Sequence, residues 1–375
     1  MDLLLEIVIV LMYPLLVPAR WLLRVLGRDP LRIRRQATRD SYWLVRASAD
    51  VPAAPGAPPA SRPDRGAAAW LAPPLVSLAR LFAPPPIPRV PTLSPLANAD
   101  VLAFYKELPF NYYGSLDAQR ASVERGRAAV EAQAPLPALL VSGARVLDVG
   151  CGAGWLANSM AYHYPVRVTG IDFNAVAITR ARDVARAMKL DAEFHETDLF
   201  RFAPPEPFDV AVSLGVLHHT NDCLAALRHV AGSMVREGGH LYVGLYHLHG
   251  RAPFLEHFAR LRAEGASEEA LYAEYRRLHV ALTDETHLRS WFRDQVLHPH
   301  ESQHTLAEVA RELLALGYRI VATSVNRFEP IADLEALYAA ERQMDVQGRA
   351  ALAEGRYYPG FFTVLAHRER PHHIG

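Results

Sequence analysis

Two kinds of residue are scarce in this chain of 375 residues. Lysine occurs only at Lys106 and Lys189, and the formal net charge is +0. Without a basic excess, the overall charge gives no reason to expect a nucleic-acid partner. Cysteine is equally rare, with only Cys151 and Cys223. Two cysteines supply neither a disulfide framework nor a four-cysteine zinc site, so the composition suits a reducing cytosol.

The beginning of the sequence differs from the rest. An apolar run covers residues 3–19, and eight arginines follow it up to residue 46. The run approaches the length of about 20 residues that a bilayer span needs, although Pro14 and Pro18 interrupt it. Arginines on its C-terminal side favour a cytosolic location for that side. We expect residues 1–46 to contact the inner face of the membrane, as a span or as an interfacial helix. Packing on the domain or on another protein is the alternative.

Composition and periodicity divide the remaining chain into a linker and a domain. Residues 47–96 are rich in proline and alanine, and 13 of the 28 prolines lie between positions 51 and 96. Such a stretch favours extended backbone without a core of its own. Residues 97–371 alternate short apolar strands with helical patterns, which predicts an α/β fold with a doubly wound, mostly parallel seven-stranded sheet. Residues 248–300 interrupt the alternation with charged helical sequence, so we expect a helical insertion after the fifth strand.

The expected elements follow from these patterns. The strands are predicted at 144–150, 166–172, 192–199, 208–215, 239–247, 319–326 and 360–368. The helices between and after them are predicted at 154–164, 174–190, 223–235, 305–318 and 331–354.

The most informative motif, DVGCGAG at 148–154, lies between the first predicted strand and its helix. Glycines there let a ligand approach the backbone closely, and the helix presents free N–H groups. A dinucleotide fingerprint would require glycine where Trp155 stands, which disfavours an NAD-dependent oxidoreductase and suits a ligand without a pyrophosphate. Asp172 ends the second strand, where a carboxylate accepts hydrogen bonds from ribose hydroxyls, and Asp198 ends the third, where it can accept from an adenine amino group. Each aspartate alone is as readily a turn former.

These segments, followed by SLGVLHHT at 213–220, resemble in their order the class I S-adenosylmethionine-dependent methyltransferases over about residues 101–369. The chain is similar in particular to a bacterial group with a long segment after the fifth strand and counterparts of GVLHHT and HPHESQHT (298–305). It departs from that group at His247, where asparagine is expected, and at Pro359, where glycine is expected.

The resemblance implies S-adenosylmethionine as the cofactor and leaves the methyl acceptor open. It places the glycines against the methionine part, Asp172 on the ribose, Asp198 on the adenine and Phe173 stacked on the adenine ring. The cofactor-binding residues that we predict are Asp148, Gly150, Cys151, Gly152, Gly154, Asp172, Phe173, Asp198, Leu199, Leu214, Gly215 and Leu217.

Candidates for the acceptor side follow the fourth and fifth strands. Methyl transfer from a sulfonium is an in-line displacement that needs alignment and a dry pocket, and an acceptor hydroxyl or amine also needs a base. His218 and His219 are candidates for that base, with a structural hydrogen bond as the alternative for each. Tyr246 ends the fifth strand, and we expect its hydroxyl to face the acceptor. Tyr112 and Tyr113, before the domain's first helix, are either lid residues or core aromatics.

His300-Glu301-x-x-His304 has the spacing of the zinc-protease signature. That signature requires both histidines on one helical face, whereas Thr305 and Glu308 form a capping box that predicts a helix beginning after the motif. We therefore expect no metal site. Instead we expect the three residues to line the acceptor pocket as candidate catalytic groups, with a hydrogen-bonded structural turn as the alternative.

The sequence thus predicts a cytoplasmic enzyme, attached to the membrane by its N-terminus, that transfers a methyl group from S-adenosylmethionine to a small-molecule or lipid-linked acceptor. The alternative is a membrane-tethered module that binds the cofactor without catalysis. The intact glycines and aspartates of the cofactor motifs favour the enzyme.

Overall fold

The computed structural model describes residues 99–370. These residues cover nearly all of the domain that the sequence predicts at 97–371. The segment 1–46, with its expected apolar helix, and the linker 47–96 lie outside them. Within the described part of the chain, no helix has the length and apolar character needed to cross a membrane.

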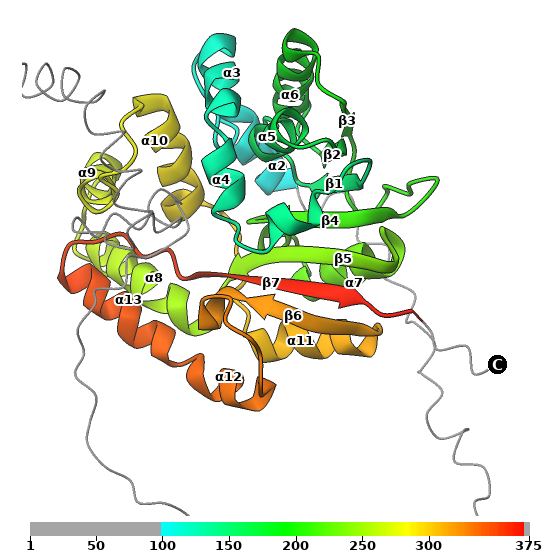
Figure 1. The fold of residues 1–375 in the computed structure, drawn as a ribbon. Coiled ribbons are helices and arrows are strands. Elements are labelled where there is room, and N and C mark those ends of the chain that lie inside the picture. The colour runs from blue at the N-terminus through cyan, green and yellow to red at the C-terminus, as the bar shows by residue number, and fades with distance from the viewer. Residues whose placement is uncertain (1–98, 371–375) are drawn as a thin grey trace, which may run out of the picture. The chain divides into compact units, whose positions relative to one another are not determined.

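Seven strands form a single sheet. They are β1 (Arg145–Val149), β2 (Arg167–Asp172), β3 (Ala192–Glu196), β4 (Phe208–Leu214), β5 (Val235–Tyr246), β6 (Tyr318–Thr323) and β7 (Phe361–Arg368). Their order is β3-β2-β1-β4-β5-β7-β6 (Figure 1). The first five in this order pair in parallel, whereas β7 runs antiparallel to both β5 and β6. The prediction of a mostly parallel seven-stranded sheet is therefore confirmed.

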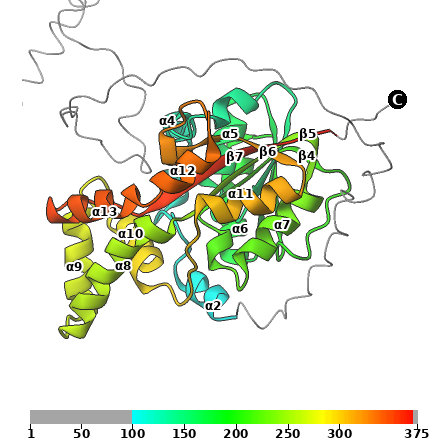
Figure 2. The same ribbon diagram turned by 90° about the horizontal axis from the view of Figure 1, so that it is seen from below.

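Helices cover both faces of this sheet (Figures 1 and 2). One face carries α5 (Trp155–His163) and α6 (Ala175–Met188), against which α3 (Leu116–Glu124) packs, and the other carries α7 (Cys223–Ser233) and α11 (Leu306–Ala315). Apolar side chains at helical spacing explain the packing, as in α6, where Ile178, Ala181 and Ala185 are buried against the sheet. Because both faces are covered, the central strand β1 is buried along almost its whole length.

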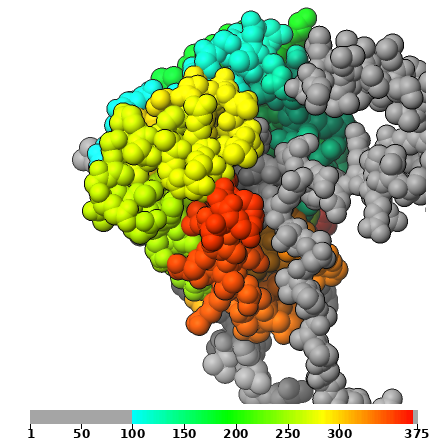
Figure 3. All heavy atoms as spheres, turned by 90° about the vertical axis from the view of Figure 1, so that its left-hand side faces the viewer, coloured from blue at the N-terminus to red at the C-terminus, as the bar shows by residue number. Residues whose placement is uncertain are grey.

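Three helices and a π-helical turn fill the segment where the sequence predicted an insertion. They are α8 (Leu248–Ala263), α9 (Glu268–Leu278), α10 (Glu285–Phe292) and the turn Arg293–Leu297. The insertion has its own aromatic core, which includes Phe258, Tyr275 and Trp291. Figure 3 shows its yellow-green and yellow surface continuous with α13 (Gln343–Ala353), which is coloured red.

The predicted single helix at 331–354 is wrong, because the chain forms two helices, α12 (Leu334–Ala340) and α13, that separate at Glu341. The Glu341 carboxylate is buried and accepts hydrogen bonds from His247 Nε2 at 2.6 Å and from the Leu306 backbone N–H at 2.6 Å. The Glu341 carboxylate thus accepts from an N–H group at the N-terminus of α11. This contact draws Glu341 toward α11, and the predicted helix is divided into α12 and α13 at this residue. Glu341 is thus the buried hydrogen-bond partner of His247, the position at which asparagine was expected from the bacterial group that the sequence resembles.

Candidate functional site

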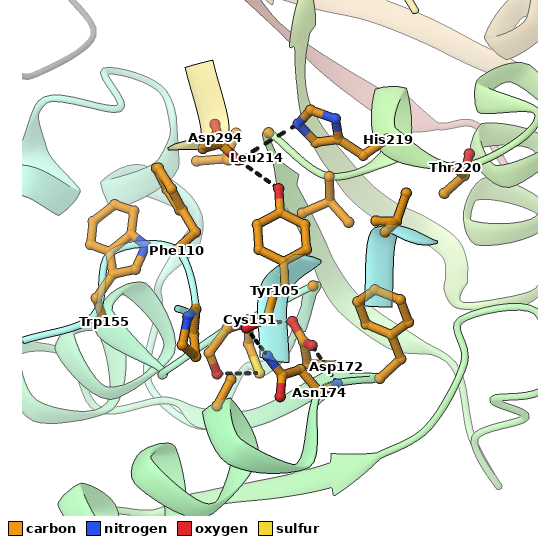
Figure 4. Close-up of a pocket in the computed structure, with 18 residues that line it drawn as sticks. Tyr105, Phe110, Cys151, Trp155, Asp172, Asn174, Leu214, His219, Thr220 and Asp294 are labelled. Carbon is orange, nitrogen blue, oxygen red and sulfur yellow. Dashed lines mark hydrogen bonds and ion pairs between the residues drawn. The ribbon is translucent and has the colours of Figure 1, made fainter. Parts of the chain in front are cut away.

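A pocket lies at the carboxyl ends of β1, β2 and β4, where ligands bind in open parallel sheets (Figure 4). The loop after β1 contributes residues 150–152 and the end of β2 contributes residues 172–174. The loop after β4 contributes residues 214–216 and His219. The remaining walls come from α2 (Ala99–Glu107), from the segment that follows it and from the π-helical turn. The pocket therefore joins the cofactor motifs to the helical insertion.

The glycines of DVGCGAG adopt backbone angles that other residues rarely take. Gly150, Gly152 and Gly154 have φ of 72°, 52° and 77°. A Cβ atom on Gly150 would lie 2.4 Å from the Val216 methyl carbons, so the turn itself excludes a side chain. A Cβ atom on Gly152 would have only the Phe110 carbonyl oxygen nearby, at 3.9 Å. The missing side chain at Gly152 therefore leaves backbone open to the pocket.

Asp172 organises this loop and opens onto the pocket. Its Oδ2 accepts a hydrogen bond from the Gly152 N–H at 2.9 Å, and its Oδ1 accepts one from the Asn174 N–H at 2.8 Å. Each oxygen keeps a further lone pair, so the carboxylate can still accept from the two hydroxyls of a ribose. The surrounding protein desolvates the carboxylate and raises the pKa of Asp172 to about 6.

Asp148 lies behind the pocket wall and does not line it. Its side chain is 4% exposed, and its Oδ2 has no hydrogen-bond partner among residues 99–370. Burial, with the nearby charge of Asp172, raises the pKa of Asp148 to about 7. Two neighbouring carboxyl groups in a poorly solvated wall favour a ligand that carries hydrogen-bond donors and positive charge. The glycine loop, the carboxylate that can accept from ribose hydroxyls and the acidic wall together fit S-adenosylmethionine.

The other predicted cofactor residues divide into two groups. Cys151, Phe173, Leu214 and Gly215 line the pocket. Gly154, Asp198, Leu199 and Leu217 are not among the residues that line it. Asp198 Oδ1 caps its own turn by accepting from the Phe200 N–H at 2.9 Å, and Leu217 is fully buried in the core beneath α7. The short 3₁₀ helix Leu217–His219 turns Leu217 inward and His219 toward the pocket.

At the far end of the pocket, Asp294 accepts hydrogen bonds from two elements that the sequence did not connect. Tyr105 on α2 donates its hydroxyl to Asp294 Oδ1 at 2.5 Å. On the other oxygen, Tyr246 donates at 3.4 Å and Gln295 Nε2 donates at 3.0 Å. Asp294 is 5% exposed, and burial raises the pKa of its carboxyl. Figure 4 shows the Tyr105 ring spanning the pocket between Asp172 and Asp294.

His219 presents an unpaired nitrogen to the same end. Its Nδ1 lies 2.9 Å from the His300 carbonyl oxygen and must donate to it, which places the lone pair on Nε2. His219 is 5% exposed, and Nε2 has no hydrogen-bond partner within the described chain. Nε2 lies 3.8 Å from Asp294 Oδ1. Burial lowers the pKa of His219 to about 4, so the imidazole is neutral at pH 7.

His218 and Tyr246 lie behind this end of the pocket and do not line it. His218 is fully buried and accepts a hydrogen bond from the Tyr246 N–H at 3.2 Å. Its ring packs on the Tyr246 ring with centroids 4.1 Å apart. Both residues therefore hold the end of β5 against the loop after β4. Tyr246 approaches the pocket only through its hydrogen bond to Asp294.

Residues 300–304 form a hydrogen-bonded strap along the end of β5 and do not line the pocket. His300 Nε2 donates to the Thr220 carbonyl at 3.0 Å, and the Glu301 carboxylate pairs with Arg251 at 2.8 Å. Two of the three side chains that we expected in the acceptor pocket are therefore engaged with neighbouring protein groups.

The backbone of His304 ties the strap to the chain around the end of β5. The His304 N–H donates to the Tyr246 carbonyl at 2.9 Å, and the Leu248 N–H donates to the His304 carbonyl at 2.9 Å. These two bonds form a short parallel bridge between His247 and His304. The geometry is that of the structural turn that the sequence left as the alternative.

Within residues 99–370, no group of three or more His, Cys, Asp or Glu side chains is arranged to hold a metal ion. The predicted capping box is confirmed, since Thr305 and Glu308 cap α11 reciprocally. The helix therefore begins after His304, and the two histidines of the motif do not share a helical face.

Tyr112 and Tyr113 also lie outside this pocket. The Tyr112 ring packs under the Arg180 guanidinium at 4.4 Å, and the Tyr113 carbonyl accepts from Arg180 at 3.0 Å. They anchor the segment after α2 to α6.

The pocket residues that sequence reasoning missed include Tyr105, Phe110, Trp155, Asn174 and Asp294. Asp294 precedes the histidine-rich segment in DQVLHPHESQHT, and that place just before the segment was the one available signal. Tyr105 belongs to a short helix whose pattern carries no chemical motif. Asn174 was identified only as the start of α6, where its side chain does accept from the Val176 N–H.

Comparisons with known proteins agree with this geometry. Residues 122–299 match a family model described as a methyltransferase domain. The ubiquinone biosynthesis O-methyltransferase of Alkalilimnicola ehrlichii is 36% identical over 126 residues, which are 33% of this chain and 49% of the relative. The protein of the same name from Aliivibrio fischeri is 37% identical over 102 residues, which are 27% of this chain and 43% of the relative. The chain thus spans about half the length of the curated relatives it matches.

Solved structures show lower similarity. PKMT2 from Rickettsia typhi is 16% identical with a TM-score of 0.46, covering 62% of this chain and 50% of that chain. Magnesium protoporphyrin IX methyltransferase from Synechocystis PCC 6803 with bound SAH is 16% identical with a TM-score of 0.40, covering 72% of this chain and 95% of that chain.

Proposed function

We propose that this chain, whose residues 122–299 match a methyltransferase-domain model, transfers a methyl group from S-adenosylmethionine to a hydroxyl group of a small or lipid-linked acceptor. The observation that carries the proposal is the unpaired Nε2 of His219. It is buried, neutral at pH 7 and faces Asp294 at the end of the pocket, 3.8 Å from Oδ1. Leaving such an acceptor atom without a partner is costly, so the site calls for a ligand that donates a hydrogen bond.

A hydroxyl is the donor that best fits this end of the pocket. Asp294 Oδ1 already accepts a hydroxyl there, from Tyr105. The names of the curated relatives support the same choice, since they are O-methyltransferases. An amine would enter as a cation at pH 7 and would have to lose a proton before its nitrogen could react.

When bound, S-adenosylmethionine supplies an electrophilic methyl group on a positively charged sulfur. Asp172 and the glycine loop hold the ribose and methionine parts, while Phe110 and Trp155 exclude water from the pocket. The acceptor oxygen bonds to the methyl carbon as the carbon–sulfur bond breaks, and the electron pair of that bond stays on sulfur. His219 Nε2 orients the acceptor by sharing its single O–H hydrogen with a neighbouring base, and the proton leaves to that base as the carbon–oxygen bond forms.

Replacing His219 by asparagine is expected to lower methyl transfer by about 100-fold, the usual cost of misplacing a reacting group by about 1 Å. Asparagine retains a donor near the position of Nδ1, so the hydrogen bond to the His300 carbonyl survives while the Nε2 acceptor is lost. The full chain would be incubated with isotopically labelled methyl donor and a cell extract, and labelled products would be counted in the water-soluble and lipid fractions.

The control is His195→Asn, because the His195 side chain is 46% exposed on β3. His195→Asn should transfer label like the unaltered chain, and both variants should bind S-adenosylhomocysteine equally well. If the unaltered chain gives no labelled product, the result would favour the alternative, a module that binds the cofactor without catalysis. Full transfer by His219→Asn would contradict the assigned role of Nε2.

Membrane attachment through residues 1–46 belongs to the same proposal. Its support is the apolar run at 3–19 and the arginines that follow it. In cell fractionation, we expect the full chain to sediment with membranes and a version beginning at Asn98 to remain in the supernatant. The attachment would place the enzyme on the cytoplasmic face, within reach of a lipid-linked acceptor. Equal solubility of both versions without detergent would contradict it.

A further inference from the structure

We propose that Asp294 is the catalytic base of the methyl transfer and takes the acceptor's proton at the place where the Tyr105 hydroxyl now donates to it. The inference rests on the proposed function and deepens it, because it names the group that receives the proton and the position of the reacting hydroxyl. Neither residue belongs to a recognised cofactor motif.

The two oxygens of Asp294 have different surroundings. Oδ2 accepts from Gln295 at 3.0 Å and from Tyr246 at 3.4 Å, both on the protein side. Oδ1 accepts from Tyr105 at 2.5 Å and lies 3.8 Å from His219 Nε2. Because the hydrogen bonds from Gln295 and Tyr246 fix Oδ2 on the protein side, the carboxylate is oriented with Oδ1 toward the pocket.

The Tyr105 hydroxyl reaches Oδ1 from a helix that buries little apolar surface. Among the residues of α2, only Val101 is buried. Polar contacts hold the helix, from Asn174 Nδ2 to the Tyr105 carbonyl at 2.8 Å and from Arg293 to the Phe104 carbonyl at 3.2 Å and to Glu107 at 2.6 Å. The Arg293 guanidinium also lies 4.6 Å from the centroid of the Phe104 ring. Elements with little buried apolar surface open at low cost in free energy. An acceptor can therefore displace the Tyr105 side chain and donate its own hydroxyl to Oδ1.

Asp294 and His219 are the two hydrogen-bond acceptors at this end of the pocket, and the proton of the methyl acceptor goes to Asp294. Burial raises the pKa of the Asp294 carboxyl, whereas burial lowers the pKa of His219 to about 4. Burial penalises the ionised form of each group, so a proton is favoured on the carboxylate and disfavoured on the imidazole. The titratable groups that face Asp294 come from α2, the turn after β4, β5, α8 and the segment 298–301: Tyr105, His219, Tyr246, Arg251, His298 and Glu301.

The charges balance in this step. The acceptor hydroxyl gives its proton to Asp294 Oδ1 while its oxygen bonds to the methyl carbon, and the electron pair of the broken carbon–sulfur bond remains on sulfur. A carboxylate and a sulfonium are thereby converted into a neutral carboxylic acid and a neutral sulfide. Losing two opposite charges together is favourable in a poorly solvated pocket, because ions are costly to hold there.

The position of the reacting hydroxyl can be tested with 4-methylphenol, which reproduces the tyrosine side chain. Tyr105→Ala should open space for it beside Asp294, and binding to the full chain would be followed by NMR. We expect Asp294→Asn in the Tyr105→Ala background to weaken binding of 4-methylphenol by about tenfold, because a charged acceptor is replaced by a neutral one. Binding of toluene, which has no hydroxyl, should be the same in both variants. Equal affinity for 4-methylphenol would overturn the proposed position.

The role as base is tested by Asp294→Asn with Tyr105 in place. Asparagine keeps the shape and one acceptor oxygen but cannot take the proton, so transfer of labelled methyl should fall by about 100-fold or more. Affinity for S-adenosylhomocysteine and the melting temperature should change little, as they should in the control Asp191→Asn, whose side chain is 74% exposed. In the unaltered chain, kcat should fall on the acid side as Asp294 becomes protonated, with an inflection above the usual range of an aspartate.

Full transfer by Asp294→Asn would overturn the assignment, and a large fall in melting temperature with unchanged kcat would make Asp294 a structural residue. If the unaltered chain transfers no label to any acceptor, the proposed function fails. The measurements with 4-methylphenol still decide whether a hydroxyl binds at Asp294.

Discussion

Replacing Asp172 by alanine is expected to weaken cofactor binding by about 100-fold or more. The carboxylate is placed to accept two ribose hydroxyls, and a hydrogen bond to a charged group contributes about 1.5–3 kcal/mol. Two such bonds correspond to about 3–6 kcal/mol, and water that enters in place of the carboxylate reduces the loss toward the lower value. The variant also removes the partners of the Gly152 and Asn174 N–H groups, so the loop loses part of its preorganisation.

The same residue predicts how binding depends on pH. Desolvation raises the pKa of Asp172 to about 6, and only the ionised form accepts from both ribose hydroxyls. Affinity should therefore be full at about one pH unit or more above this pKa and should fall as the pH drops through it, because the proton and the cofactor compete for the carboxylate. In Asp172→Asn this dependence should disappear.

Calorimetry of the full chain with S-adenosylhomocysteine between pH 5 and pH 8, ~1 pH unit or more on either side of the expected pKa, measures both effects. The control is Asp191→Asn, which removes an exposed carboxylate one strand away and should bind like the unaltered chain. The assignment of the cofactor site would be contradicted by unchanged affinity in Asp172→Ala, or by tighter binding of NAD than of S-adenosylhomocysteine.

The second large effect concerns stability. Arg251 is fully buried, and its guanidinium donates to both oxygens of Glu301, at 3.1 Å and 2.8 Å. It also donates to the Gln295 carbonyl at 2.7 Å and lies between the rings of Tyr246 and Phe254, at 3.9 Å and 4.5 Å from their centroids. One side chain therefore joins α8, the π-helical turn and the strap.

Arg251→Met should lower the free energy of unfolding by about 3–5 kcal/mol, the usual cost of leaving one member of a buried ion pair without its partner. Burial alone would raise the pKa of Glu301, and Arg251 holds it below its usual range, so the unpaired carboxylate would be destabilised. Glu301→Gln in the Arg251→Met background should recover part of the loss. Urea denaturation followed by circular dichroism measures each value.

The matched control is Arg349→Met, which breaks surface pairs with Glu256 and Asp345; the Arg349 side chain is 53% exposed. Pairs of that kind contribute about 0–1 kcal/mol, so this variant should unfold nearly like the unaltered chain. Equal unfolding free energies for the two arginine variants would show that Arg251 does not stabilise the strap.

The sequence by itself determined the fold class and the cofactor end of the site. Strand–helix alternation predicted the sheet, and a parallel sheet brings the carboxyl ends of its strands to one edge, so the glycine loop and Asp172 had to meet. These residues are close in sequence to the strand ends that carry them, and local geometry was enough to place them. The same reasoning did not extend to Asp198 and Leu217, because Asp198 caps its own turn and Leu217 packs in the core, and neither lines the pocket.

Only the tertiary structure decided the acceptor end. Tyr105 and Asp294 are separated by 189 positions in the chain, and they meet because α2 and the helical insertion pack over the same strand ends. No local pattern encodes that contact. His300, Glu301 and His304 carry the more suggestive motif, yet the Thr220 carbonyl engages His300 and Arg251 engages Glu301. The His304 Nε2 lies 2.9 Å from Ser302 Oγ. A polar side chain remains available to a ligand only if folding brings it no hydrogen-bond partner. Those partners come from distant parts of the chain, so the local sequence does not reveal them.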